Sequence, residues 1–119
     1  MDTIFISGLT AATTIGVYDH ERDITQDLII DLELGCDSRK AGSSDAFEDA
    51  LDYDAIARRT QTFVQQTSYY LIESVAEKLS QILFDEFPIM QMKIKITKPD
   101  AVDIAAAVGI MIERERERD

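Results

Sequence analysis

The stretch that decides the fold runs from Met90 to Pro99 and reads MQMKIKITKP. Its apolar and polar side chains alternate as far as Thr97, which is typical of a β-strand with one buried face. The segment 24–34 shows the same alternation, with leucine or isoleucine at every even position from 28 to 34. Both stretches therefore predict half-buried strands of one sheet.

Extended structure is also predicted toward both ends of the chain. Residues 3–9 and 11–18 are rich in isoleucine, threonine and valine, and Gly8 and Gly16 favour bends or bulges there. Valine and isoleucine at alternate positions from 108 to 112 predict a last strand.

Two amphipathic helices are predicted between these strands. The first begins near Tyr53, where Asp52 is a suitable N-cap, and its apolar residues follow helical spacing. The second spans residues 71–86 and is closed by Pro88. The order β-β-α-α-β-β predicts an α+β fold, in which a four-stranded antiparallel sheet carries two helices on one face.

The length of 119 residues fits a single domain, 1–119. Residues 113–119 read ERERERD and predict a charged, solvated C-terminal tail. The formal net charge of −11 argues against nucleic acid and against an anionic membrane as partners, because both are bound by clustered lysine and arginine.

Counts of cysteine and histidine restrict the location and the metal chemistry. The single cysteine, Cys36, cannot form an intramolecular disulfide and fits a reducing compartment. No segment resembles a signal peptide or approaches the roughly 18 apolar residues of a membrane span. We therefore expect a cytoplasmic protein. With His20 as the only histidine, a zinc site is disfavoured, and only a carboxylate-bound Mg²⁺ or Ca²⁺ stays open.

Lys98 interrupts the pattern of the deciding strand. It has the parity of the apolar residues at 92, 94 and 96, so it falls on the buried face just before Pro99. A lysine held against apolar surface can become a usable acid or base. The alternative is that the strand frays there and the ammonium group reaches water. The pattern alone leaves both interpretations open.

Three further side chains have a structural and a functional interpretation. Glu73, in the first turn of the second helix, favours the helix dipole, but it could also accept paired N–H bonds from a planar heterocycle. Tyr53 lies on the apolar stripe of the first helix and could belong to the core. Glu21 lies in the charged segment 19–23, where turn residues are normally solvated. These residues by themselves define an α+β domain with an unusual lysine.

Five segments together resemble the bacterial dihydroneopterin aldolase family. They are TTIGVYDHE at 13–21, LDY at 51–53, LIESVA at 71–76, ITKP at 96–99, and VGI with ER at 108–114. They follow the family's order and spacing over nearly the whole chain. The resemblance implies the tunnelling fold, in which four subunits join edge to edge into a tetrameric ring and two rings stack into a homo-octamer. The active sites would then lie between subunits.

The activity that the resemblance implies is the retro-aldol cleavage of 7,8-dihydroneopterin. The products are 6-hydroxymethyl-7,8-dihydropterin and glycolaldehyde, on the route to folate, and many members also epimerise the side chain. No cofactor or metal is expected, because the ring imine of the pterin accepts the electrons and the protein only moves protons.

The resemblance also assigns roles to individual residues. Proton transfer is assigned to Lys98, Tyr53 and Glu21. Recognition of the pterin is assigned to Glu73, Ile72, Leu51, Asp52, Val17 and Tyr18. In this assignment Glu73 binds the amino-pyrimidine edge, and Val17 and Tyr18 wall the pocket from the adjacent subunit.

One departure from the family and three alternatives remain. The family often has a glycine after its lysine-proline pair, whereas this chain has Asp100, which could alter Lys98 or point to solvent.

A dihydroneopterin triphosphate epimerase is disfavoured by the acidic balance and by the retained Lys98-Pro99 pair. A non-catalytic α+β binding module would not need the site residues. The zinc-dependent cyclohydrolases of the same fold are disfavoured by the lack of histidine and cysteine ligands.

Overall fold

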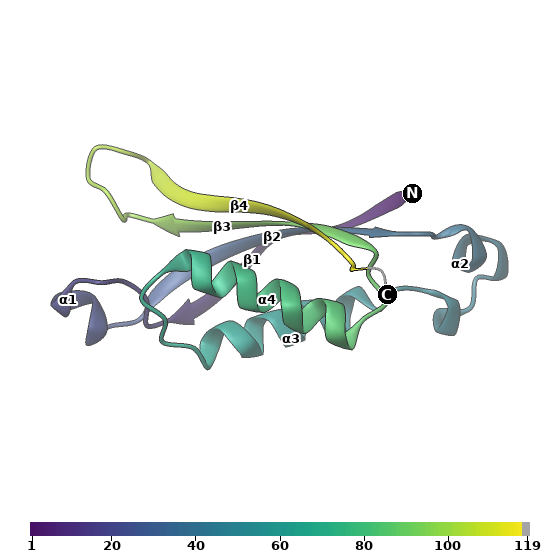
Figure 1. Cartoon of the computed structure of the whole chain (residues 1–119), viewed down its shortest axis with the longest axis horizontal. Coiled ribbons are helices and arrows are strands. Elements are labelled where there is room, and N and C mark those ends of the chain that lie inside the picture. The colour runs from purple at the N-terminus through teal and green to yellow at the C-terminus, as the bar shows by residue number, and fades with distance from the viewer. Residues whose placement is uncertain (118–119) are drawn as a thin grey trace.

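Four antiparallel strands form one sheet in the computed structural model, which describes residues 1–117 (Figure 1). The strands lie in the order β1-β2-β3-β4. They are β1 (Asp2–Thr13), β2 (Gln26–Cys36), β3 (Gln91–Pro99) and β4 (Ala107–Glu115). Helices α3 (Tyr53–Gln65) and α4 (Ile72–Glu86) cover one face of the sheet. The predicted fold class, the antiparallel sheet and the order of its strands and two main helices are therefore confirmed.

The core lies between this sheet and the two helices. Leu32 is paired with Ile6 on one side and with Ile94 on the other, and the even-numbered apolar residues of β2 and β3 are almost fully buried. Val75 and Leu79 of α4 are fully buried against them. Burial of each such side chain stabilises the fold by about 1.5–3 kcal/mol. The apolar face of each strand, set by a two-residue period, and the apolar face of each helix, set by a 3.6-residue period, therefore both turn toward the core.

A bulge divides β1 at Gly8, as the sequence predicts. The register of β1 against β2 shifts between Ile6 and Leu9. Gly8 has a φ of 69° and its N–H donates to Oδ1 of Asp31 at 2.8 Å. The bulge moves the buried positions of β1 from even to odd residues, so that Leu9 still packs against the core.

Three short helical segments were not predicted. They are α1 (Asp19–Arg22), α2 (Arg39–Ser44) and the 3₁₀ helix η1 (Phe47–Asp49). The sequence predicts a charged turn at 19–23 and a loop at 37–49. Each segment has only three to six residues, which is too short for helical periodicity to appear in the pattern.

The prediction that residues 113–119 form a solvated tail was wrong for residues 113–116. Strand β4 continues through Glu115, and Arg116 donates hydrogen bonds to the carbonyls of Phe84, Phe87 and Ile89. Pairing with β3 and these hydrogen bonds hold the segment against the protein, although its charged sequence favours contact with water. Residues 118–119 lie outside the part of the chain that the structure describes.

The two ends of the sheet carry different elements (Figure 1). Helix α1, the end of β3 and the start of α4 gather at one end, and α2 and the start of α3 lie at the other. The hydroxyl of Thr13, at the end of β1, donates to the carbonyl of Thr67, just after α3, which places the C-terminal end of α3 at the first of these ends. None of the helices within residues 1–117 is long and apolar enough to cross a membrane.

Candidate active site

Lys98 and Glu21 meet at the end of β3, although they are 77 residues apart in the chain. The Lys98 ammonium group donates to Oε2 of Glu21 at 2.6 Å, and the two side chains are only 13% and 11% exposed. Lys98 has the parity that the sequence predicts, and its ammonium group is held by a carboxylate instead of reaching water. Breaking a buried pair of this kind typically costs 3–5 kcal/mol, because one charge is left without a partner.

The Glu21 carboxylate is held by two further donors and by a glycine. Gln26 donates its side-chain amide to Oε2 at 3.1 Å, and the Tyr18 N–H donates to Oε1 at 3.3 Å. Gly16 adopts a φ of 126°, and a β-carbon built there would lie 2.2 Å from the carboxyl carbon of Glu21. The carboxylate therefore occupies the space that any side chain at position 16 would need.

These contacts explain the electrostatics of Glu21. The hydrogen bond from Lys98, followed by the bond from Gln26, lowers the pKa of Glu21 from its ordinary value of 4.5 to about 2. Burial acts in the opposite direction but is outweighed. Glu21 is accordingly an ionised acceptor at neutral pH.

Asp100 follows Pro99 in a left-handed conformation, with a φ of 60°. Glycine adopts this region without strain, and aspartate tolerates it better than most residues. The backbone conformation thus accounts for the glycine that the resembling family often has here. Asp100 is exposed, and the partner of the Lys98 ammonium group is Glu21.

The start of α4 lies at the same end of the sheet as α1 and the end of β3 (Figure 1), the two elements that carry the ion pair. Leu71 is the N-cap residue, Ile72 is half-buried against the core, and Glu73 stands exposed in the first turn. Among residues 1–117, none donates a hydrogen bond to the Glu73 carboxylate. Its position at a helix N-terminus stabilises the charge, so it can accept N–H donors from a bound molecule.

Val17 and Tyr18 belong to the same loop as Glu21. They are 56% and 66% exposed and precede Glu21 by four and three residues. Within one chain, both residues therefore lie close in sequence to the Glu21–Lys98 pair. That Val17 and Tyr18 wall a pterin pocket from the adjacent subunit stays a prediction.

Leu51, Asp52 and Tyr53 lie at the opposite end of the sheet. Asp52 caps α3, since its Oδ1 accepts the N–H of Ala55 at 3.0 Å, and Leu51 is buried. Tyr53 is 61% exposed, so it is not a core residue. Helix α3 has 13 residues, and its start is therefore about 18 Å from its end near Thr67. Within one chain, Tyr53 does not reach Lys98.

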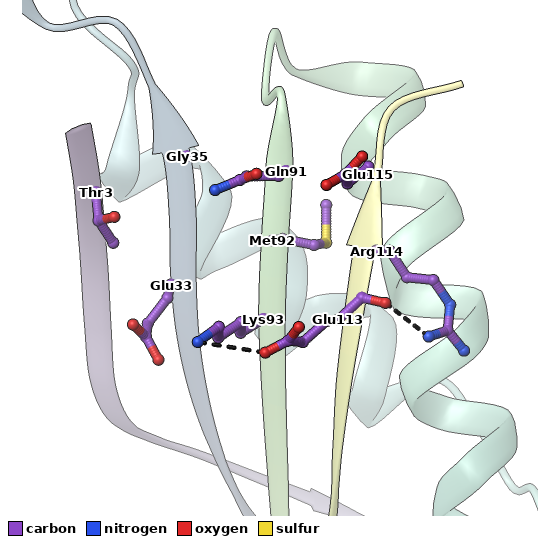
Figure 2. Close-up of a pocket in the computed structure, with 9 residues that line it drawn as sticks. All are labelled: Thr3, Glu33, Gly35, Gln91, Met92, Lys93, Glu113, Arg114 and Glu115. Atoms are coloured by element: carbon purple, nitrogen blue, oxygen red, sulfur yellow. Dashed lines mark hydrogen bonds and ion pairs between the residues drawn. The ribbon is translucent and has the colours of Figure 1, made fainter. Parts of the chain in front are cut away.

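A depression of about 440 Å³ on the helix-free face is separate from this site (Figure 2). Its walls include Glu33, Lys93 and Glu113, and Lys93 forms a 3.3 Å ion pair with Glu113. It contains none of the residues that the sequence assigns to chemistry. Within residues 1–117, no group of three or more histidine, cysteine, aspartate or glutamate side chains is placed to hold a metal ion.

Two residues that the sequence did not assign to the site support its centre. Gln26 links the Glu21 carboxylate to the carbonyl of Ile15, to which its amide donates at 2.9 Å. Gly16 was predicted only as a bend, and no pattern in the sequence indicates that a carboxylate fills its missing side chain. Both roles arise because the loop 14–22 folds back against the start of β2.

A four-stranded antiparallel sheet with two helices on one face, and a largely buried lysine–glutamate ion pair at one end, defines a protein of the tunnelling-fold class. The family model described as dihydroneopterin aldolase matches residues 4–113. The chain belongs to the dihydroneopterin aldolase family.

Individual relatives agree with this assignment. The dihydroneopterin aldolase of Escherichia coli K12 is 44% identical over 114 residues, which are 96% of this chain and 93% of the relative. The Haemophilus influenzae enzyme is 37% identical over 96% of this chain and 97% of its own length. The crystal structure of the E. coli enzyme in complex with neopterin superposes with a TM-score of 0.93 and covers 96% of this chain and 99% of that one.

Proposed function

We propose that the protein is a lyase that cleaves 7,8-dihydroneopterin into 6-hydroxymethyl-7,8-dihydropterin and glycolaldehyde, a step of folate biosynthesis. The observation that carries this proposal is the Lys98–Glu21 ion pair of 2.6 Å, which is largely withdrawn from solvent at the end of β3. Membership of the family and the similarity to an enzyme crystallised with neopterin support the choice of a pterin.

Recognition of the pterin is proposed to begin at the start of α4. The exposed Glu73 carboxylate accepts two N–H donors from the amino-pyrimidine edge, and backbone groups at Ile72 complete that edge. Hydrogen bonds to a charged group contribute about 1.5–3 kcal/mol each. Val17 and Tyr18, both exposed beside Glu21, provide apolar surface for the ring.

The cleavage is proposed to need only proton transfers from the protein. Removal of the proton from the side-chain hydroxyl two carbons from the ring releases the aldehyde as the carbon–carbon bond breaks. The electron pair of that bond enters the ring imine, and a proton returns to the ring-attached carbon. Lys98 handles these protons, Glu21 orients its ammonium group, and Tyr53 assists. Because the ring itself accepts the electrons, we propose that no metal or organic cofactor is required.

A complete site is proposed to form between two subunits. Leu51, Asp52 and Tyr53 lie about one helix length from Lys98, so a neighbouring chain has to supply them. Strands β1 and β4 leave two open edges to the sheet, and edge-to-edge joining of four chains into a ring pairs these edges. We propose that two such rings stack into an octamer.

Two further properties complete the proposal. If glycolaldehyde is recaptured on its opposite face before release, the same proton transfers epimerise the side chain. The buried, free Cys36 fits a reducing cytoplasm.

The proposal is tested by an assay of the purified protein with 7,8-dihydroneopterin in the presence of a chelator. We expect hydroxymethyl-dihydropterin to form at a rate that Lys98→Ala lowers by at least about 10²-fold. Lys95→Ala, which removes an exposed lysine of the same strand, should retain full activity. A folded wild-type protein that yields no product would refute the aldolase, and faster turnover of the triphosphate would favour the epimerase.

Mixing two inactive variants tests the shared site. Lys98→Ala and Tyr53→Phe chains are unfolded, combined and refolded together. If each site takes Lys98 from one chain and Tyr53 from its neighbour, about a quarter of the sites in a random mixture have both groups intact. Activity would then return on mixing, whereas sites built within single chains would stay inactive.

A further inference from the structure

Arg22 joins two loops that carry different parts of the site. It follows Glu21 directly and is the last residue of α1. Its guanidinium group donates to the carbonyl of Gly16 at 2.9 Å, in its own loop, and to those of Tyr69 at 3.1 Å and Ser68 at 2.5 Å in the connection between α3 and α4. The same group lies over the ring of Tyr70, 4.2 Å from its centroid.

Each of the joined loops leads directly to a functional group. The first loop holds the Glu21 carboxylate against Lys98, and the connection 66–71 ends at the N-cap of α4, immediately before Ile72 and Glu73. The guanidinium group therefore spans the gap between the proton-transfer pair and the helix start that is proposed to bind the pterin.

The chemistry of arginine suits this position. Its planar fork offers five N–H donors in fixed directions, so it can serve several carbonyls and still stack on an aromatic ring. A lysine has one ammonium group and cannot reproduce that arrangement. The acceptors are neutral carbonyls in a partly buried setting. The strength of these hydrogen bonds therefore depends on their geometry more than on the ionic strength of the solution.

The connection 66–71 has a second anchor that does not involve Arg22. The Thr13 hydroxyl donates to the Thr67 carbonyl at 2.7 Å, and the Thr67 hydroxyl donates to the Val64 carbonyl at 2.7 Å. Loss of Arg22 therefore releases residues 68–71, next to the helix start, while Thr67 stays fixed. The Glu21 carboxylate also keeps its bonds from Lys98 and Gln26.

We propose that Arg22 is a positioning residue of the aldolase, which sets the distance between the Glu21–Lys98 pair and the pterin-binding start of α4. This inference rests on the proposed function. It assigns Arg22 no contact with the substrate. A displacement on the order of 1 Å between reacting groups can lower a rate by about 10²-fold, so a small shift of this loop has a measurable effect on turnover.

The chain contains a matched control for Arg22. Arg116 also donates to three carbonyls, those of Phe84, Phe87 and Ile89, and lies 5.2 Å from the centroid of the Phe84 ring. It binds the C-terminal end of α4 and the following segment, away from Lys98. Arg22→Met and Arg116→Met therefore remove equivalent sets of bonds at opposite ends of one helix.

The test compares kcat, the Kd for neopterin and the urea midpoint of the wild type, Arg22→Met, Arg22→Lys and Arg116→Met. We expect both Arg22 variants to lose about 10- to 100-fold in kcat with a smaller change in Kd, and Arg116→Met to keep its kcat at a comparable loss of stability. Equal kcat in the wild type and the Arg22 variants would overturn the inference, as would an equal loss in Arg116→Met.

A fourth variant covers the case in which Arg22→Met does not fold. Tyr70 is 61% exposed, so Tyr70→Leu should fold and weaken only the stacking on Arg22, with a kcat a few-fold lower. An unchanged kcat in both Tyr70→Leu and Arg22→Lys would also overturn the inference. If the wild type itself forms no product, the proposed aldolase function has failed, and that result is distinct from an active wild type with active Arg22 variants.

Discussion

Substitution of Gly16 by alanine directly tests the arrangement around Glu21. The new β-carbon would lie 2.2 Å from the carboxyl carbon of Glu21 and 2.3 Å and 2.4 Å from its two oxygens. Ordinary contact begins at 3.4 Å, so the carboxylate has to move by about 1.2 Å. It would then be displaced from a Lys98 bond that is 2.6 Å long in the native protein.

The expected cost has two separable parts. The φ of 126° at Gly16 is strained for any L-residue, which lowers the free energy of unfolding by about 1–3 kcal/mol. The displaced carboxylate no longer orients the Lys98 ammonium group, and a shift of this size is expected to lower kcat by about 10²-fold. The first effect is on stability and the second on catalysis.

Gly8→Ala is the control that separates these effects. Gly8 also has a positive φ, 69°, but a β-carbon there meets nothing within 4 Å. We expect Gly8→Ala to lower the urea midpoint and to leave kcat for 7,8-dihydroneopterin cleavage unchanged. The reasoning is refuted if Gly16→Ala keeps a kcat within about twofold of the wild type while the two variants are similarly destabilised.

Three other predictions concern pH, binding and stability. Because the pKa of Glu21 is lowered in the folded state to about 2, the unfolded chain takes up its proton first as the pH falls. The stability contributed by Glu21 is complete above about pH 4.5 and is lost as the pH falls toward 2; it is on the order of 2 kcal/mol after allowance for solvent screening. Urea midpoints across this range should fall more steeply for the wild type than for Glu21→Gln, and parallel curves would contradict the prediction. Glu73→Ala should weaken neopterin binding by about 10- to 100-fold in calorimetry, as expected for lost bonds to a carboxylate, and an unchanged Kd would remove Glu73 from the binding site. Asp52→Ala should lower the free energy of unfolding by about 1 kcal/mol through loss of the α3 cap; Asp54→Ala, at an exposed ion pair, should cost less than half of that, and equal losses would argue against the cap.

The loop 14–22 shows where prediction from sequence stops. The charged run at 19–23 indicates a solvated turn, yet Glu21 is buried and Arg22 is bound to backbone carbonyls. A run of charged residues indicates only that such residues, on average, prefer contact with water. It does not contain the partners, Lys98 and the connection 66–71, that compensate for burial.

The C-terminal segment shows the same limit of a local charge pattern. The alternation of glutamate and arginine after Ile112 predicts a free tail, but Glu113 and Glu115 lie on the exposed face of β4, where alternate residues point to solvent. Arg114 instead pairs with Glu77 of α4 at 2.8 Å. An edge strand can carry charges on both faces when one face meets a charged helix surface.

The sequence by itself determined the elements and their inward faces. Alternation along β2 and β3, helical spacing along α3 and α4, and the Asp52 cap are all set by neighbours within a few residues, so a linear pattern contains them. The parity of Lys98 was visible for the same reason. Only the tertiary structure decided that Lys98 meets Glu21, that Gly16 leaves room for the carboxylate, and that Tyr53 lies at the far end of the sheet. These relations join residues that are distant in the chain, and they depend on how loops return to the core, which no local periodicity encodes.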